Sequence, residues 1–400
     1  MERESGHTEE SEKPAVTAGR GELFLSFLRL GCTAFGGPAM VAYIRELAVR
    51  RKRWLPGGSF ENGVALCQSI PGATSMQMAG YVGLRAAGPS GALAAFVGFG
   101  VPAFVLMLLL SAAYGRMGNL APVMRAFEGM HMVVLALVAE AAWRFARRDI
   151  RGLRDVLLAA AAGAFLIGGG SPIMAVAASG VLGLLVYWRP GGEGRVPELR
   201  VQSGAREAVR FAALFALVTA ATLLLLFAVE PTLRNLATAM VRVGLFAFGG
   251  GFGAVPLMLH EVVVIHRWLG SKAFLDGITL GQITPGPVLI TATFVGYEVA
   301  GPLGAVVATA GAFAPSFLIL VVSVPYFDRL QRAAAFRRAM RGVLVSFVGL
   351  LAALVVSLGM AVRWGVPGAI LAAAAFAALR LKVDVLWVVL AGAAASVLVM

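Results

Sequence analysis

Charged residues are scarce in this 400-residue chain, at 14% of all positions, whereas hydrophobic residues make up 59%. An ordinary soluble domain carries roughly 25% charged residues. The composition therefore excludes that class and predicts an all-α polytopic integral membrane protein. Long strands of alternating hydrophobicity are also missing, which argues against a membrane β-barrel.

Cysteine is nearly absent too, and several catalytic motifs are missing altogether. Cys32 and Cys67 each stand alone in an apolar segment, so we expect no disulfide and no metal site and interpret both as small buried residues. The phosphate-binding motif G-x-x-x-x-G-K-[ST] is absent, as are H-E-x-x-H and G-x-S-x-G. An ATP-driven pump within this chain is thereby excluded, an enzyme lacks a visible nucleophile, and no cofactor is expected.

The net charge of +13 would suit a nucleic-acid partner, but its distribution argues otherwise. The arginines stand in short blocks between apolar segments, which is the positive-inside pattern of membrane proteins. Nucleic acid is therefore not an expected partner. Residues 1–20 are polar, rich in acidic residues and without the hydrophobic region of a signal peptide, and we interpret them as a disordered cytoplasmic tail.

What the sequence does contain is one unusual pattern twice. From Arg29 it reads R-L-G-C-T-A-F-G-G-P, and from Arg242 it reads R-V-G-L-F-A-F-G-G-G. A second pair, W-L-P-G-G-S-F-E-N-G-V-A-L-C-Q-S-I-P-G from Trp54 and W-L-G-S-K-A-F-L-D-G-I-T-L-G-Q-I-T-P-G from Trp268, aligns without a gap. Apolar segments interrupted by Gly and Pro at matching positions of two halves are the best sequence pointer to a transporter's substrate site.

The remaining apolar segments define the domain organisation. In the two halves they run at about 91–113, 127–143, 153–169 and 172–188, and at about 302–324, 343–360, 366–379 and 384–400. One unmatched segment lies between the halves, and an odd helix there inverts the second half in the membrane. We therefore predict a first repeat at 21–190, a cytoplasmic loop at 191–208, a linking helix at 209–229 and a second, inverted-topology repeat at 230–400.

The motif segments themselves, at about 22–44 and 61–84, allow two structures. Each is long enough for a straight span at 1.5 Å per residue, but Gly and Pro favour a break in the helix. Re-entrant hairpins keep the basic block at 45–53 in the cytoplasm, as the positive-inside rule favours, whereas straight spans place it outside. Irregular backbone at membrane depth persists only inside protein or beside a polar cavity. Four broken or re-entrant helices, two per half, therefore predict one shared site at the midplane.

Arg29 and Arg242 each stand six positions before an F-G-G motif, inside apolar sequence. One interpretation is that both side chains extend to the membrane interface. The other is that the pair binds an anion, because a guanidinium recognises oxyanions through several hydrogen bonds.

Further candidate ligands come from the breaks, since helix starts carry partial positive charge and free N–H groups. Close helix packing would also explain the glycines, and interhelical packing the glutamines. Glu46, Glu261 and Asp276 either pair with the arginines or carry protons, or they cap helix ends. The complete predicted binding set is Arg29, Arg242, Gly36, Gly37, Gly249, Gly250, Gln68, Gln282, Pro71, Gly72, Pro285 and Gly286.

These motifs resemble the chromate ion transporter family in its long-chain, two-domain form. The resemblance rests on F-G-G-P at 35–38, F-G-G-G at 248–251, the W-L…Q…P-G segments and G-x-x-G-A in each half. It implies export of chromate, with sulfate as a similar competitor, from the bacterial cytoplasm. One departure is that P-G-A-T at 71–74 replaces the family's usual P-G-P-E, whereas P-G-P is kept at 285–287.

We therefore predict a secondary transporter, not an enzyme, in the bacterial inner (plasma) membrane. It exports chromate-like tetrahedral oxyanions and is driven by the membrane potential or by ion coupling. The expected partners are a small inorganic oxyanion, the lipid bilayer and a second copy of the chain in a homodimer. The alternatives are an importer of sulfate or another anion, an anion channel and, less favoured, a membrane-embedded enzyme.

Overall fold

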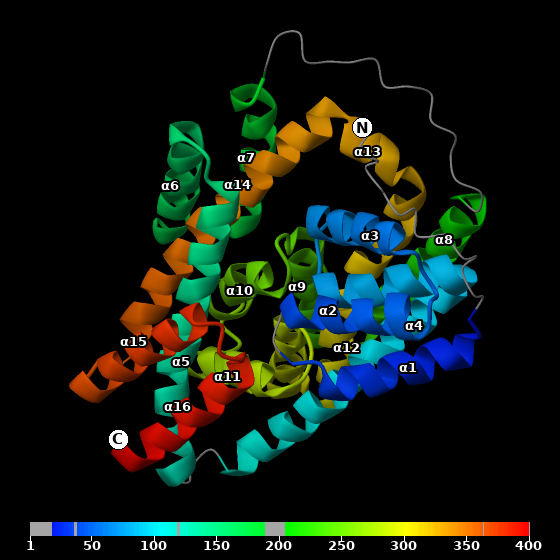
Figure 1. Ribbon diagram of the computed structural model, residues 1–400. Coiled ribbons are helices and arrows are strands. Elements are labelled where there is room, and N and C mark those ends of the chain that lie inside the picture. Colours follow the sequence, from blue (N-terminus) through cyan, green and yellow to red (C-terminus); the bar gives the residue numbers. More distant parts are fainter. Residues whose placement is uncertain (1–17, 36–37, 118–120, 189–204, 363, 400) are drawn as a thin grey trace, which may run out of the picture.

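The computed structural model describes residues 18–35, 38–117, 121–188, 205–362 and 364–399. Most of the predicted tail and loop, together with Gly36 and Gly37, lie outside these residues. In the described part, all regular structure is helical (Figure 1). The all-α class predicted from composition is confirmed.

The first half contains seven α-helices and one π-helix in the described residues. In order they are α1 (Arg20–Thr33), α2 (Pro38–Arg45), η1 (Glu46–Arg51), α3 (Gly57–Ser69), α4 (Thr74–Met117), α5 (Ala121–Asp149), α6 (Leu153–Ile167) and α7 (Pro172–Val186). The linking helix is α8 (Ala205–Val229), which begins slightly before the expected residue 209.

The second half repeats this order with short helical turns at its breaks. Its elements are α9 (Pro231–Phe246), η2 (Gly251–Gly253), α10 (Ala254–Leu259), η3 (His260–Ile265), α11 (Ser271–Ile283), η4 (Val288–Ile290), α12 (Thr291–Ser323), η5 (Val324–Tyr326), α13 (Phe327–Arg332), α14 (Ala334–Ala361), α15 (Val366–Arg380) and α16 (Val385–Val399).

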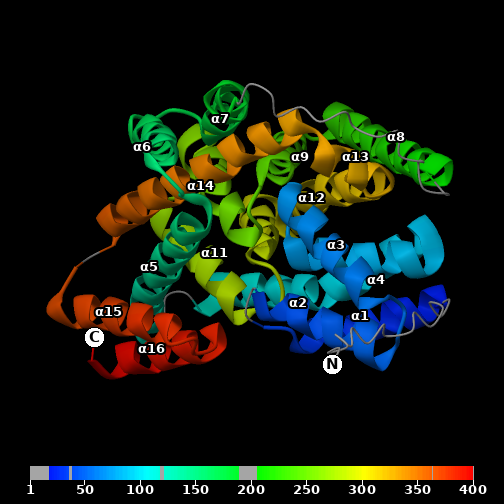
Figure 2. The same cartoon turned by 45° about the horizontal axis from the view of Figure 1, so that its top comes forward.

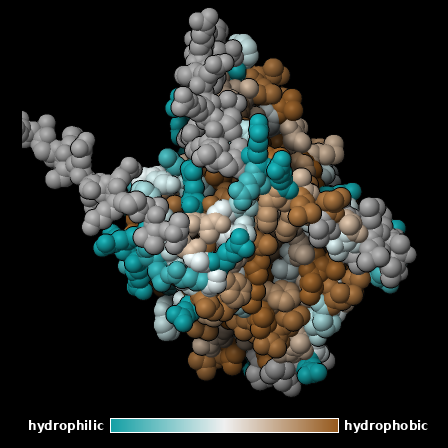
Figure 3. Space-filling view, turned by 90° about the vertical axis from the view of Figure 1, so that its right-hand side faces the viewer, coloured by the Kyte–Doolittle hydropathy of each residue, from teal (hydrophilic) through white to brown (hydrophobic). Residues whose placement is uncertain are grey.

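Every predicted apolar segment lies largely in a helix. Among the described residues, four helices are long and apolar enough to cross a membrane: Thr74–Arg116, Val123–Asp149, Val288–Tyr326 and Ala334–Ala361. One face of the molecule shows hydrophobic side chains over its lower part and hydrophilic side chains mainly in a band above them (Figure 3). The chain is a multi-pass membrane protein.

The internal repeat extends to details of the backbone. The π-helices η1 and η3 occupy matching positions, and each is followed by an arginine with positive φ, 53° at Arg53 and 52° at Arg267. Each long central helix turns sharply at a glycine, with φ of 69° at Gly88 in α4 and 62° at Gly301 in α12. The two halves therefore share the same order of helices and the same irregular backbone positions.

The motif segments are broken where the sequence predicts. Helix α1 ends at Thr33 and α2 begins at Pro38, while α3 ends at Ser69 and α4 begins at Thr74. Helices α1 and α3 have 14 and 13 residues, or about 20 Å at 1.5 Å per residue. That is short of the roughly 30 Å hydrocarbon core, so neither piece spans the membrane by itself and each motif segment is broken rather than one continuous helix.

The last helices of each half are exchanged between the halves. Helices α15 and α16 pack on α5, while α6 and α7 pack on α14 (Figures 1 and 2). The contacts are close: a Cβ built at Gly129 of α5 would lie 2.1 Å from the Ser396 Cβ, and one at Gly342 of α14 would lie 2.1 Å from the Ser179 carbonyl oxygen. Helices α4 and α12 pack against each other at the centre.

One prediction about the cysteines is wrong. Cys67 is buried, but Cys32 is exposed. Helix α1 buries Leu23, Phe27 and Gly31, which lie four residues apart and so share one face. Cys32 is one residue further along and therefore points away from that face.

Candidate functional site

The four predicted breaks meet as two reciprocal pairs across the halves. The backbone N–H of Gly72 donates to the carbonyl of Ala247 at 2.8 Å, and that of Gly286 donates to the carbonyl of Ala34 at 3.2 Å. Each Pro-Gly break of one half is thus bonded to the A-F-G-G break of the other. We call this set of breaks the central junction.

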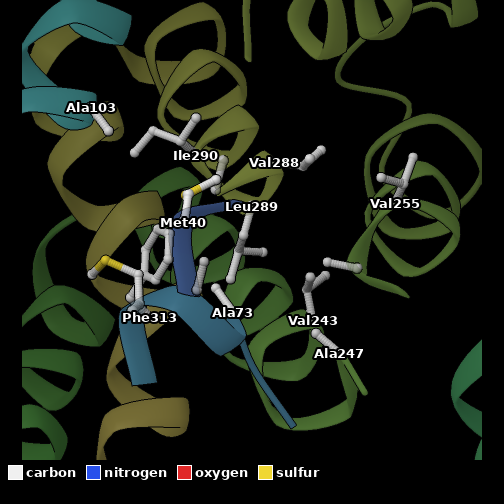
Figure 4. Close-up of a cluster of buried hydrophobic side chains, with 14 of the residues drawn as sticks. Met40, Ala73, Ala103, Val243, Ala247, Val255, Val288, Leu289, Ile290 and Phe313 are labelled. Carbon is white, nitrogen blue, oxygen red and sulfur yellow. The ribbon is translucent and has the colours of Figure 1, made fainter. Parts of the chain in front are cut away.

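Helix starts surround the central junction. A Cβ built at Gly250 would lie 3.5 Å from the hydroxyl of Thr74, the first residue of α4, and one at Gly251 would lie 3.1 Å from the backbone nitrogen of Val288, the first residue of η4. Hydrophobic side chains, including Ala73, Ala247 and Val288, lie near them (Figure 4). Because helix N-termini carry positive partial charge, this junction is electrically suited to an anion.

Glycine is required at the Pro-Gly breaks for two reasons. The φ angles are +129° at Gly72 and +126° at Gly286, in a region that side chains rarely allow. A Cβ at Gly72 would also lie 2.3 Å from the Ser316 Cβ, and one at Gly286 would lie 2.8 Å from the Ala103 Cβ. The two breaks have the same backbone but different neighbours.

Polar side chains gather at the first of these breaks. Gln77 donates from Nε2 to the carbonyl of Pro71 at 2.6 Å, while the Gln77 Oε1 and the Ser316 Oγ are buried without a hydrogen-bond partner in the described part of the chain. The Gln282 Nε2 is a third such atom. Unpaired buried polar groups are costly, and of these three atoms the Ser316 Oγ and the Gln282 Nε2 can donate a hydrogen bond, whereas the Gln77 Oε1 can only accept one.

Sequence reasoning missed Gln77, Ser316 and Thr74. The available signals were a glutamine in the first turn of a long apolar helix and a serine directly after Pro315. A single polar residue in an apolar helix has many explanations. Only proximity to Gly72, for Gln77 and Ser316, and to Gly250, for Thr74, distinguishes these three residues.

Arg29 and Arg242 lie at matching places, each five residues before the alanine whose carbonyl joins the central junction. Both side chains are exposed. The Arg242 Nη1 lies 4.0 Å from the Oε1 of buried Glu261, whose Oε2 is 3.7 Å from the His266 Nε2. No contact between Arg29 and Arg242 is observed, and Arg29 forms no ion pair with the residues that the structure describes.

The other predicted site residues are not equivalent between the halves. Gln282 is buried whereas Gln68 is exposed. Glu46 is paired with Arg50 and Arg51 at 3.5 and 3.4 Å on the surface, and its structural counterpart at the start of η3 is His260 rather than Glu261.

Asp276 has the most elaborate environment of the predicted acids. Its Oδ1 lies 2.6 Å from the His131 Nε2, and its Oδ2 accepts a hydrogen bond from Tyr114 at 2.7 Å. Both partners belong to the other half. His131 and Tyr114 were not among the predicted residues, since neither belongs to a repeated motif.

Comparison with known proteins matches the same two halves. The model of the chromate transporter family matches twice, at residues 21–184 and 234–397. No solved structure gives a significant match.

Several proteins are similar over most of the chain. An uncharacterized transporter of Methanocaldococcus jannaschii is 41% identical over 92% of this chain and 91% of its own length. Chromate transport proteins of Cupriavidus metallidurans and Pseudomonas aeruginosa are 32% and 30% identical, over 88% and 89% of this chain and 85% of their own lengths. The chain belongs to the chromate transporter family.

Proposed function

We propose that this chain is a secondary transporter that exports chromate-like tetrahedral oxyanions, chromate and with it sulfate, from the cytoplasm across the bacterial inner membrane. The observation that carries the proposal is the central junction, where reciprocal hydrogen bonds join the breaks of both halves beside the starts of α4 and η4. Helix starts of this kind bind anions through free N–H groups. The names of the relatives from Cupriavidus metallidurans and Pseudomonas aeruginosa support chromate as a substrate.

In this proposal the helix starts at the breaks direct their positive dipole ends toward the anion, and side chains provide positive charge and hydrogen-bond donors. Arg29 and Arg242 bring the two positive charges that a dianion needs, and each stands five residues before the alanine that joins the junction. Ser316 and Gln282 offer donors that no described residue uses. The remaining proposed ligands are Gly36, Gly37, Gly249, Gly250, Gln68, Pro71, Gly72, Pro285 and Gly286.

The direction follows from electrostatics. Moving one charge through 100 mV is worth about 2.3 kcal/mol, so a dianion that leaves a negative-inside cell gains roughly 4–5 kcal/mol. Uptake would instead need at least two co-transported cations to neutralise the same dianion. The membrane potential therefore favours export without ATP.

The membrane arrangement that we propose has two inverted repeats, 21–190 and 230–400, joined by α8. A single linking helix reverses the direction of the second repeat. The reciprocal hydrogen bonds and the reciprocal exchange of terminal helices support a pseudo-two-fold relation, and a site at the repeat interface is typical of transporters built in this way. A homodimer is also proposed.

Flux in inverted membrane vesicles tests the proposal. Vesicles that contain the chain should accumulate radiolabelled sulfate and chromate when the lumen is made positive, and each anion should compete with the other. Vesicles without the chain provide the baseline. Accumulation that occurs only in right-side-out vesicles would identify an importer and contradict the proposed direction.

A further inference from the structure

A buried cluster at the interface of the two halves contains three titratable side chains, and the central junction does not explain it. Asp276 of α11 lies 2.6 Å from His131 of α5 and accepts a hydrogen bond from Tyr114 of α4. The side chains of His131 and Asp276 are only 6% and 5% exposed. The rings of Phe127 and Phe294 pack edge-on against the ring of Tyr114, with ring centroids 5.6 and 5.2 Å apart. The cluster therefore borders apolar side chains.

The internal repeat offers two equivalent positions for such a cluster, and the acid–histidine pair occurs at only one of them. The position of Asp276 in the first repeat is held by Asn62, which is exposed. Gly129 of α5 and Gly342 of α14 each pack closely against a serine of an exchanged terminal helix, Ser396 and Ser179. If these two glycines are taken as equivalent, the counterpart of His131 is Leu344. The matching positions of the repeat thus hold Asn62 and Leu344, neither an acid nor a histidine. A general requirement of the architecture does not account for the pair.

One proton decides the charge of the cluster. With one proton between them, the Asp276 carboxylate and the His131 imidazole form a pair with no net charge. Without that proton, a carboxylate faces a neutral ring and leaves one uncompensated negative charge in a buried place, which is unfavourable. Tyr114 donates its O–H to the carboxylate in either state.

In the described part of the chain, the hydrogen bonds and ion pairs of Asp276 and His131 join them to each other and to Tyr114. Helices α4, α5, α12, α14 and α16 pack on α11, as do η3 and η4, and α16 and η4 carry no titratable side chain. Lys272 lies one turn before Asp276 on α11 and is exposed, as is Glu128 on α5. The Arg341 of α14 is bound to Asp155. Of the other titratable or charged groups on these elements, Glu298 acts electrostatically on Tyr114. The full set is Tyr81, Arg85, Arg116, Arg125, Glu140, Arg144, Arg147, Arg148, Asp149, His260, Glu261, Tyr297, Glu298, Arg337 and Arg338.

We propose that Asp276 and His131 form the proton-binding site that couples anion transport to proton movement, an inference that rests on the proposed function. The proton passes from water to the pair and back, and no covalent bond other than that to hydrogen changes. Because the pair joins α11 of one half to α5 of the other, its protonation alters the bond between the two halves. Binding of a proton and movement of the halves are therefore linked, and the linkage is reciprocal.

The test uses purified protein reconstituted in vesicles, with the potential clamped at zero and radiolabelled sulfate as the probe. For one proton per anion, a pH difference of one unit should drive accumulation of up to about tenfold in the wild type. Asp276→Asn keeps the shape and one hydrogen-bond acceptor but binds no proton, so it should lose this accumulation while sulfate–sulfate exchange continues. His131→Gln should weaken the same response. Asn62→Ala, at the matching place, should behave as the wild type.

The outcomes separate the two levels of the proposal. If the wild type moves neither sulfate nor chromate, the proposed function fails. If it moves them but a pH difference drives no accumulation, or if Asp276→Asn responds as the wild type does, the coupling site is rejected. A merely structural pair predicts lower thermal stability of Asp276→Asn with an unchanged pH response. Independently of transport, a pH-difference infrared spectrum of the purified protein should contain a carboxyl or imidazole band of the pair that is absent from both Asp276→Asn and His131→Gln, and an unchanged spectrum in Asp276→Asn would overturn the assignment.

Discussion

Replacing the paired arginines separately should distinguish a binding role from a structural one, because their surroundings differ. Arg242 lies 4.0 Å from the buried carboxylate of Glu261, whereas Arg29 has no ion pair among the described residues. Two unit charges 4 Å apart attract by about 4 kcal/mol at an effective dielectric of 20. Since the Arg242 side chain is 53% exposed, water screens most of this, and about 1 kcal/mol remains.

Arg242→Gln should therefore lower both transport and stability, whereas Arg29→Gln should lower transport alone. The stability loss of Arg242→Gln should largely disappear in a Glu261→Gln background, because there is then no buried carboxylate that loses the attraction of Arg242. A charge-assisted hydrogen bond contributes about 1.5–3 kcal/mol, so each single variant should reduce anion affinity by roughly tenfold or more. Arg→Lys should recover little, since an ammonium lacks the planar guanidinium geometry.

The assays are radiolabelled sulfate and chromate flux in vesicles and thermal unfolding of purified variants, at matched expression. Arginines that only extend to the interface predict a different result: Lys would replace them fully, and Gln would reduce expression rather than turnover. Normal flux in a well-expressed Arg29→Gln/Arg242→Gln double variant would refute the binding role of the pair.

Three further predictions concern the junction, the exchanged helices and the topology. Gly72→Ala places a side chain at φ +129° and 2.3 Å from the Ser316 Cβ, and should cost about 2–4 kcal/mol in thermal unfolding; adding Ser316→Gly should recover only the steric part, and full recovery would show that the backbone angle is unimportant. Asp155→Asn weakens the pair with Arg341, which lies at 2.9 Å across the halves, and should cost about 2–3 kcal/mol; an unchanged unfolding temperature would contradict this. In a background without native cysteines, a cysteine at Lys52 should react with a membrane-impermeant reagent only from the cytoplasm and one at Lys272 only from outside; outside labelling at Lys52 would exclude the hairpin topology.

The sequence predicted those features that local chemistry determines. Helices follow from apolar runs of sufficient length, and breaks follow from Gly and Pro, as the positive φ angles of Gly72 and Gly286 demonstrate. The repeat was visible because its motifs align without a gap. The four breaks were expected to share one site at the midplane, which stays a prediction, and two hydrogen bonds join them in pairs across the halves.

Features that depend on contacts between distant segments could not be predicted. Gln68 and Gln282 match in sequence, yet only Gln282 is buried, because the two halves have different neighbours at these positions. The terminal helices consist largely of Ala, Leu and Val. Their sequences therefore do not indicate that α15 and α16 pack on α5 rather than on α14. His131 likewise stands in an ordinary apolar helix, and only folding brings Asp276 to it.

The exchange of terminal helices also determines when, during synthesis, each half can finish packing its helices. Helix α5 ends at Asp149, but the helices that cover it end only at Val399. At about 5–20 residues per second, a ribosome needs roughly 10–50 s to synthesise the intervening chain. During that interval the first half exposes a face that has no partner within its own sequence. The first half therefore cannot complete its packing before the second half is synthesised. Loss of the last two helices would leave the apolar face of α5 uncovered and would not yield a smaller functional transporter.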